Sequence, residues 1–356
     1  MRLRKGAAFL QSPIALFREN GDSNAMTGKS AANARPRIRP ALWLAAGTGA
    51  LALCQCAPRF TLVSQPKDAA AIAARNETFG YRKWVSTQVE PDLVVIGLHG
   101  FDGATIDYEN FGKDLLVRQP KTALYAYELR GQGNDPLKSR RGDIDQPADW
   151  YRDLDAFTRL VRQRHPRARI VWMGESMGAL IAAHAWREAP ADRPPCDALI
   201  FSSPVVKIRD DVPAWKIGLL DAAATAAPLA RISLNTLSGG QDVQMTHDST
   251  HSTQAQTNAW HVDKNTLRLL STLGNHIQSM NDCAATLRVP VLILHGGRDF
   301  FTDEAAIRGF ASHIPASTPV TRREYPDSYH LLMYDQQKAK VFGDIERWLI
   351  RLRRDP

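Results

Sequence analysis

A serine between two glycines is the feature of this 356-residue chain that most clearly indicates chemistry, in the run Gly174-Glu175-Ser176-Met177-Gly178. An apolar run precedes it, and a predicted helix begins at Met177. A GxSxG sequence between a strand and a helix predicts a sharp turn that exposes the serine hydroxyl as a nucleophile. The Met177 N–H, at the start of that helix, is suited to stabilise a developing oxyanion.

A serine nucleophile needs a base and an acid, and after such a turn they are expected in the order Ser, acid, His. Asp299 follows the apolar run 289–294 closely, and His330 lies on a loop before the final predicted helix. We therefore expect Asp299 to be the acid and His330 the base that serves Ser176. Asp303 lies about one helical turn after Asp299 and is expected to cap a helix instead.

A second oxyanion donor is expected from the loop after the first core strand. That loop reads Leu98-His99-Gly100-Phe101-Asp102-Gly103, which makes the Phe101 N–H the natural candidate. His99 could be taken for a base. Its position directly before Gly100 favours a structural role in shaping the loop.

The elements that must position these residues alternate between apolar runs and helical patterns, as in an α/β fold with a mostly parallel sheet. The runs predicted as strands are 93–98, 123–127, 170–173, 198–201, 289–294 and 320–325. Apolar residues at helical spacing predict helices that include 150–161 and 335–354. Strands that are nearly continuously apolar are typical of a sheet covered on both faces.

Residues 205–283 interrupt this alternation and contain no convincing buried strand. Helices are predicted near 215–229 and 265–280, with a polar stretch at 238–257 between them. An insertion of this size between two core strands predicts a lid. The apolar residues of its first helix could contact an acyl chain or form the core of the lid itself.

The polar stretch contains His247-Asp248-Ser249-Thr250-His251, which resembles the zinc-binding HExxH pattern. That pattern requires a helix and a Glu base. This segment has neither the Glu nor good helix-forming residues, so we predict no metal site. No cofactor is expected for a serine nucleophile of this kind.

The charge of the chain is concentrated at its N-terminus. The total is +8, and residues 1–53 hold eight basic and two acidic residues, which leaves only +2 for the other 303. The nearly balanced charge of residues 54–356 argues against a nucleic-acid partner. An apolar content of 44% and a charged content of 23% are typical of a globular protein.

The basic N-terminal residues, 1–40, are followed by thirteen uncharged residues, 41–53, and then by Cys54. This layout is typical of a secretory signal, and the apolar run is too short for an ordinary membrane span. Met26 as the true start would give the signal a compact basic region. We expect an exported or membrane-anchored protein on the periplasmic side of a bacterial inner membrane, associated through residues 41–56 and possible as a lipoprotein at Cys54.

The expected organisation therefore has four parts. They are a signal or anchor segment (1–58), a first part of the core (59–204), the lid insertion (205–283) and a second part of the core (284–356).

Five motifs in this order, LHGFDG, ELRGQGND, GESMGA, LHGGRD and SYH, resemble the α/β-hydrolase superfamily. The resemblance spans about residues 77–354. It is strongest to the monoacylglycerol lipase and lysophospholipase group, which is also grouped with the S33-type serine aminopeptidases. The motifs depart from the group at Glu175, where His is usual, at Glu128, where Asp is usual, and at Ala179, where Gly is usual.

The resemblance implies the α/β-hydrolase fold and a role for each candidate residue. Ser176 would be the nucleophile, Asp299 the acid and His330 the base, with the Phe101 and Met177 amides as the oxyanion hole. It implies cleavage of carboxylic esters, with a small acyl ester or lipid such as a monoacylglycerol or lysophospholipid as substrate. An aminopeptidase or amidase of the same fold, and a non-catalytic binding protein that retains the fold, remain alternatives.

Overall fold

The computed structural model describes residues 58–63, 78–233, 243–248, 258 and 260–354. Residues 1–57 of the predicted signal or anchor segment, Cys54 included, therefore lie outside the described residues. The folded body that follows is a single compact unit and is described by itself.

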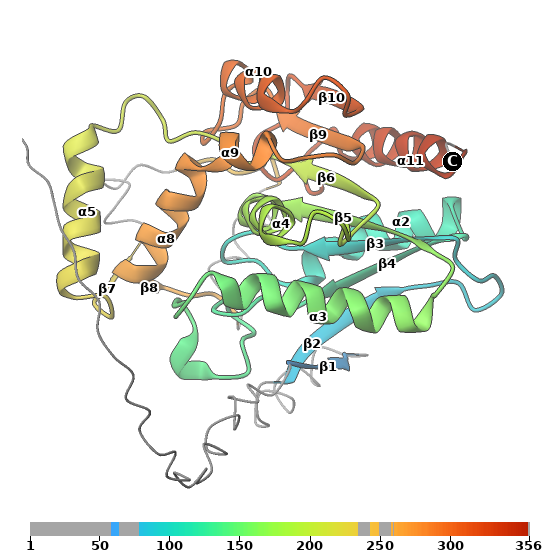
Figure 1. Cartoon of the computed structure of the whole chain (residues 1–356), viewed down its shortest axis with the longest axis horizontal. Coiled ribbons are helices and arrows are strands. Elements are labelled where there is room, and N and C mark those ends of the chain that lie inside the picture. The colour runs from blue at the N-terminus through green and yellow to red at the C-terminus, as the bar shows by residue number, and fades with distance from the viewer. Residues whose placement is uncertain (1–57, 64–77, 234–242, 249–257, 259, 355–356) are drawn as a thin grey trace, which may run out of the picture. The chain divides into compact units, whose positions relative to one another are not determined.

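A central sheet of eight strands, counted within the described residues, organises this body (Figure 1). The strands lie in the order β1-β2-β4-β3-β5-β6-β9-β10, and only the pair β2–β4 is antiparallel. Their bounds are β1 Arg59–Leu62, β2 Thr78–Trp84, β3 Leu93–Leu98, β4 Thr122–Tyr127, β5 Arg169–Glu175, β6 Ala198–Ser202, β9 Val291–Gly296 and β10 Val320–Tyr325. The prediction of a mostly parallel sheet is confirmed.

Helices cover both faces of the sheet, which explains why its central strands are apolar throughout. On one face lie α3 (Ala148–Arg164), α4 (Met177–Glu188) and α10 (Glu304–His313), and on the other lie α2 (Glu109–Arg118) and α11 (Lys338–Arg354). Short 3-10 helices span Thr105–Tyr108 (η1) and Lys138–Arg140 (η2).

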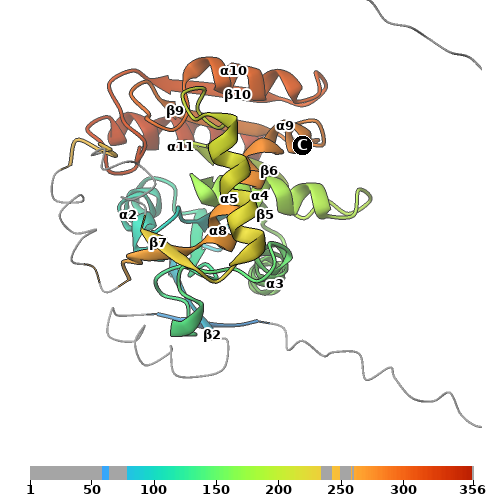
Figure 2. The same ribbon diagram turned by 90° about the vertical axis from the view of Figure 1, so that its left-hand side faces the viewer.

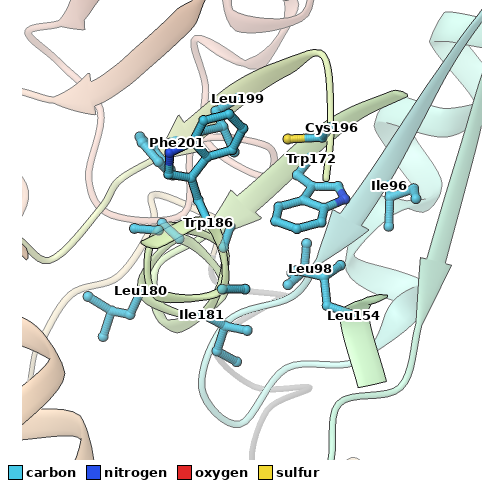
Figure 3. Close-up of a cluster of buried hydrophobic side chains, with 14 of the residues drawn as sticks. Ile96, Leu98, Leu154, Trp172, Leu180, Ile181, Trp186, Cys196, Leu199 and Phe201 are labelled. Carbon is cyan, nitrogen blue, oxygen red and sulfur yellow. The ribbon is translucent and has the colours of Figure 1, made fainter. Parts of the chain in front are cut away.

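The core beneath α4 fixes the position of the turn that begins this helix. Figure 3 shows Leu180 and Ile181 of α4 in one buried cluster with Leu98, Trp172 and Phe201 of the sheet. Burial of such side chains stabilises a fold by roughly 1.5–3 kcal/mol each. The N-terminus of α4 is therefore held firmly against the ends of β3 and β5.

Helix α11 begins at Lys338, three residues later than the pattern predicted. The carboxylate of Asp335 accepts hydrogen bonds from the backbone N–H groups of Tyr329 and Gln336. These bonds hold the chain in a series of turns, and the helix can begin only after them.

The insertion contains α5 (Ala214–Ala226), β7 (Arg231–Ser233), β8 (Lys264–Thr266) and α8 (Leu267–Gln278), and α9 (Met280–Ala284) crosses its expected end at residue 283. The pair β7–β8 is antiparallel and was not predicted, because three-residue strands leave almost no periodic signal. Hydrogen bonds from Thr266 to Gly142 and from Val262 to Asp102 tie the insertion to loops that follow β4 and β3. It therefore lies at the carboxyl edge of the sheet.

Helix α5 packs alongside α8 and faces outward (Figure 2). None of its residues is buried, and Trp215 and Leu219 are more than half exposed. Trp215 and Leu219 therefore do not form a buried core of the lid, whereas Ile217 and Leu220 of the same helix are half-buried.

Candidate active site

Ser176 occupies the sharp turn between β5 and α4, with φ of 52° and ψ of −114°. This is a strained conformation for a residue with a side chain, and such strain persists only where the surroundings enforce it. A Cβ at Gly178 would lie 2.1 Å from the carbonyl oxygen of Leu98, and one at Gly174 would lie 2.4 Å from the backbone nitrogen of Ala179. Both glycines are therefore required for the turn to close.

The loops that carry the other candidates follow neighbouring parallel strands. The adjacent strands β3, β5, β6, β9 and β10 are parallel, so their carboxyl ends meet at one edge of the sheet. Phe101, Ser176, Asp299 and His330 follow β3, β5, β9 and β10 respectively. The topology thus gathers residues that are far apart in the sequence.

The structure brings His330 and Asp299 into direct contact. His330 Nδ1 lies 2.8 Å from Asp299 Oδ2, and both side chains are almost completely buried. The other carboxylate oxygen of Asp299 accepts the N–H of Phe301 at 2.8 Å. A buried carboxylate bonded in this way orients the imidazole and would stabilise its charged form.

The second ring nitrogen of His330, Nε2, is buried and has no hydrogen-bond partner among the described residues. It therefore forms no hydrogen bond with the Ser176 hydroxyl either. A buried polar atom without a partner is costly and calls for an explanation. An imidazole nitrogen that receives a proton during a reaction would have this environment, because catalytic hydrogen bonds often form only when substrate is bound.

The two candidate oxyanion donors lie on loops that meet at Ser176. A Cβ at Gly100 would lie 3.4 Å from Ser176 Cβ, so the loop that carries Phe101 passes directly beside the serine. Neither the Phe101 nor the Met177 N–H donates a hydrogen bond to a described residue. Free N–H groups beside a nucleophile are what an oxyanion hole requires.

His99 has a structural role here, as its position before Gly100 predicts. Its Nδ1 bonds to the Gly100 carbonyl oxygen at 2.9 Å, and its Nε2 accepts the N–H of Leu129 at 3.0 Å. Burial lowers the pKa of His99 to about 4, although the hydrogen bond to Gly100 acts in the opposite direction. The ring is therefore neutral at pH 7 and joins two loops.

A group of buried carboxyls below the serine was not predicted. Burial, with a further contribution from the charge of Asp107, raises the pKa of Glu175 to about 8. Burial likewise raises the pKa of Asp107 to about 7. One oxygen of Glu175, Oε1, has no partner among the described residues. The departure at Glu175 from the usual His was the only sequence signal for this group.

The segment that resembled a zinc motif lies against the loop of His330. His247 Nδ1 is 2.6 Å from Asp335 Oδ1, whereas His251 lies outside the described residues. Within the part of the chain that the structure describes, no three His, Cys, Asp or Glu side chains are grouped as a metal site requires. Cys196 and Cys283 are free, buried thiols.

A parallel sheet covered by helices, with a strained serine turn and a His–Asp pair at its carboxyl edge, defines the α/β-hydrolase fold. The chain belongs to the serine aminopeptidase S33 family, whose sequence pattern matches residues 89–337. Both predictions made from the motifs, the fold and the family group, are thereby confirmed.

Similar proteins include a monoacylglycerol lipase from Mycolicibacterium smegmatis, which is 22% identical over 273 residues, 76% of this chain and 92% of that one. Among solved structures, a soluble variant of monoglyceride lipase from Saccharomyces cerevisiae matches with a TM-score of 0.63 at 17% identity, over 77% of this chain and 92% of that one. A thermostable carboxyl esterase from Bacillus coagulans matches with a TM-score of 0.65 at 13% identity, over 76% and 93%. The structural likenesses show the fold.

Proposed function

We propose that the chain is a serine hydrolase that cleaves carboxylic esters through Ser176, His330 and Asp299. The observation that carries the proposal is the buried 2.8 Å contact between His330 and Asp299, which leaves Nε2 of the imidazole free at the edge of the sheet where Ser176 lies. The names of the similar lipases and the esterase support ester substrates.

In this mechanism His330 Nε2 accepts the Ser176 proton while the hydroxyl oxygen attacks the ester carbonyl carbon. The Phe101 and Met177 N–H groups donate to the oxyanion, and loss of one such donor typically costs about 100–1,000-fold in rate. The tetrahedral intermediate releases the alcohol, which takes the proton from His330, and leaves an acyl-enzyme. Water, activated by the same histidine, then hydrolyses the acyl group from Ser176.

A monoacylglycerol or lysophospholipid is the proposed substrate class. Trp215, Leu219 and Leu229 of the insertion are 65%, 60% and 63% exposed. Trp215 and Leu219 lie one helical turn apart on α5, and exposed apolar side chains that lie close together are typical of a surface that contacts lipid or another apolar partner. The position of the insertion at the carboxyl edge of the sheet supports the proposal that residues 205–283 act as a lid over the serine.

A cavity near the site with several charged residues in its lining does not suit an acyl chain. It has a volume of about 310 Å³, lies beside Asp299, and is lined in part by Lys207, Arg209, Asp210 and Asp211. Pockets for apolar ligands are lined mainly by apolar side chains. We therefore do not assign this cavity to the acyl group.

Membrane association through residues 41–56 and a location on the periplasmic side of an inner membrane are part of the proposal. The basic residues before the apolar run would remain on the cytoplasmic side, which places the body outside. No helix within the described residues is both long and apolar enough to span a membrane.

A substrate panel tests the proposed function. It contains monoacylglycerols, lysophospholipids, short p-nitrophenyl esters and aminoacyl amides, each assayed with the wild type and Ser176→Ala. Ester turnover that depends on Ser176, with little turnover of the amides, is the expected result. Preferred turnover of aminoacyl amides would identify an aminopeptidase, and failure of the protein to react with a fluorophosphonate would identify a non-catalytic member of the fold.

A further inference from the structure

Two stretches of the insertion lie against the two loops that carry the base and an oxyanion donor. Residues 243–248 contact the loop of His330, and residues 260–262 contact the loop of Phe101. Each contact is made by a histidine of the insertion and an aspartate of the core.

The contact made by His261 holds the residue next to Phe101. Asp102 has a φ of 55°, a conformation that is unfavourable for a residue with a side chain. Its carboxylate lies 2.6 Å from His261 Nδ1 and accepts the Val262 N–H at 2.8 Å, while its own N–H donates to Gln132 Oε1 at 2.9 Å. Three contacts therefore enforce a strained backbone beside a candidate oxyanion donor.

The contact made by His247 holds the residues on both sides of His330. The buried carboxylate of Asp335 lies 2.6 Å from His247 Nδ1 and accepts the Tyr329 N–H at 2.6 Å. The Leu331 N–H donates to the Met245 carbonyl oxygen at 2.9 Å. Tyr329 and Leu331 are thus each bonded either to the insertion or to the aspartate that the insertion contacts.

We propose that His247 and His261 are positioning residues, through which the insertion fixes the base loop and the oxyanion loop in their working geometry. The proposal rests on the proposed function, because it assigns His330 and Phe101 their catalytic roles. Its physical basis is that a displacement of about 1 Å at a reacting group can cost about 100-fold in rate. The insertion is then part of the catalytic apparatus as well as a cover.

His→Ala and His→Asn variants at both positions test this proposal with p-nitrophenyl acetate, a substrate too short to need an acyl-binding lid. An Asn amide can donate a hydrogen bond as imidazole Nδ1 does, whereas Ala cannot. We expect His247→Ala and His261→Ala each to lower kcat by about tenfold with KM changed less than about twofold, and each Asn variant to recover most of the loss.

The matched control is Arg268→Ala. Arg268 also ties the insertion to the core, through the carboxylates of Asp143 and Asp145. Within the described residues, its side chain forms no hydrogen bond or ion pair with the loops that carry Phe101 and His330. It is expected to keep the kcat of the wild type. A kcat that falls equally in the control, or is unchanged in both Ala variants, would overturn the proposal.

These measurements distinguish a failure of the positioning proposal from a failure of the proposed function. Wild-type turnover of p-nitrophenyl acetate and its loss in Ser176→Ala establish the serine mechanism independently of the histidines. Thermal unfolding of every variant identifies any loss of activity that is due to unfolding.

Discussion

The Ser203 hydroxyl donates a 2.6 Å hydrogen bond to the backbone carbonyl oxygen of His330. Its neighbour Ser202 accepts the N–H of Ser176 at 3.0 Å through its own carbonyl oxygen. The end of β6 therefore holds the backbones of both the candidate nucleophile and the candidate base. This arrangement sets their separation without any direct bond between them.

Removal of the Ser203 hydroxyl should lower activity more than stability. A buried hydrogen bond contributes about 1 kcal/mol to folding, and Leu332 still donates to the same carbonyl oxygen. We expect Ser203→Ala to lower kcat by about tenfold, because the base shifts relative to Ser176. Steady-state kinetics and thermal unfolding measure the two effects. Ser312→Ala, which removes an exposed hydroxyl bonded to the Gly309 carbonyl oxygen, is the control.

A pair of variants tests whether Asp299 or Asp303 is the acid that serves His330. Asp303 caps α10 by accepting the Ala306 N–H at 2.7 Å, as the sequence predicted. Asp299→Asn should lower kcat by about 10⁴-fold, because the amide would favour the wrong imidazole tautomer. Asp303→Asn should retain activity, since Asn is also a good helix cap. A larger loss in Asp303→Asn would show that the acid is misassigned.

Glu175 should make stability depend on pH. Burial raises the pKa of its carboxyl from 4.5 to about 8, so the folded state holds a proton that the unfolded state releases. Stability from this group is therefore complete below about pH 4.5 and is lost as the pH rises to about 8. The melting temperature of Glu175→Gln, relative to the wild type, should rise by at least about 3 °C between pH 5 and pH 8.5.

The control for this measurement is Glu324→Gln, which removes an exposed carboxylate. Its melting temperature relative to the wild type should be nearly independent of pH over the same range. If the difference in melting temperature between Glu175→Gln and the wild type does not change with pH, Glu175 is ionised in the folded state over the whole range from pH 5 to pH 8.5.

Cell fractionation checks the proposed location. The full chain should sediment with membranes, because the apolar run 41–53 would be an aggregation liability on an exposed surface. A chain that begins at about Arg59, where β1 starts, should stay in the supernatant and keep its ester hydrolysis. Recovery of the full-length, unprocessed chain in the cytosolic fraction would contradict the location.

The sequence predicted those features that depend on local constraints. The turn at Ser176 could be predicted because the run from strand to helix and the two glycines are all local. The contact between Asp299 and His330 could be predicted because chain order and parallel strands fix which loops meet. Strand β2 was missed, since only some of its residues are buried and it lies next to the edge of the sheet.

The contacts that support the site could not be predicted in the same way. Asp102 and His261 are 159 residues apart, and Ser203 and His330 are 127 apart. Such contacts have no periodicity, and each uses residue types that are common on surfaces. The role of the apolar residues of α5 could not be predicted either. An apolar helix pattern does not reveal whether another element covers the helix.

The most direct test of the central claim is the mass of the intact protein after reaction with a fluorophosphonate, measured for the wild type and for Ser176→Ala in parallel with ester turnover. Only an activated serine reacts with this probe. The wild type should gain the mass of one adduct, located on the peptide that contains Ser176, and should lose its ester turnover. Ser176→Ala should gain no adduct and show no turnover while unfolding at the temperature of the wild type. An adduct or wild-type turnover in Ser176→Ala would contradict the assignment of Ser176 as the nucleophile.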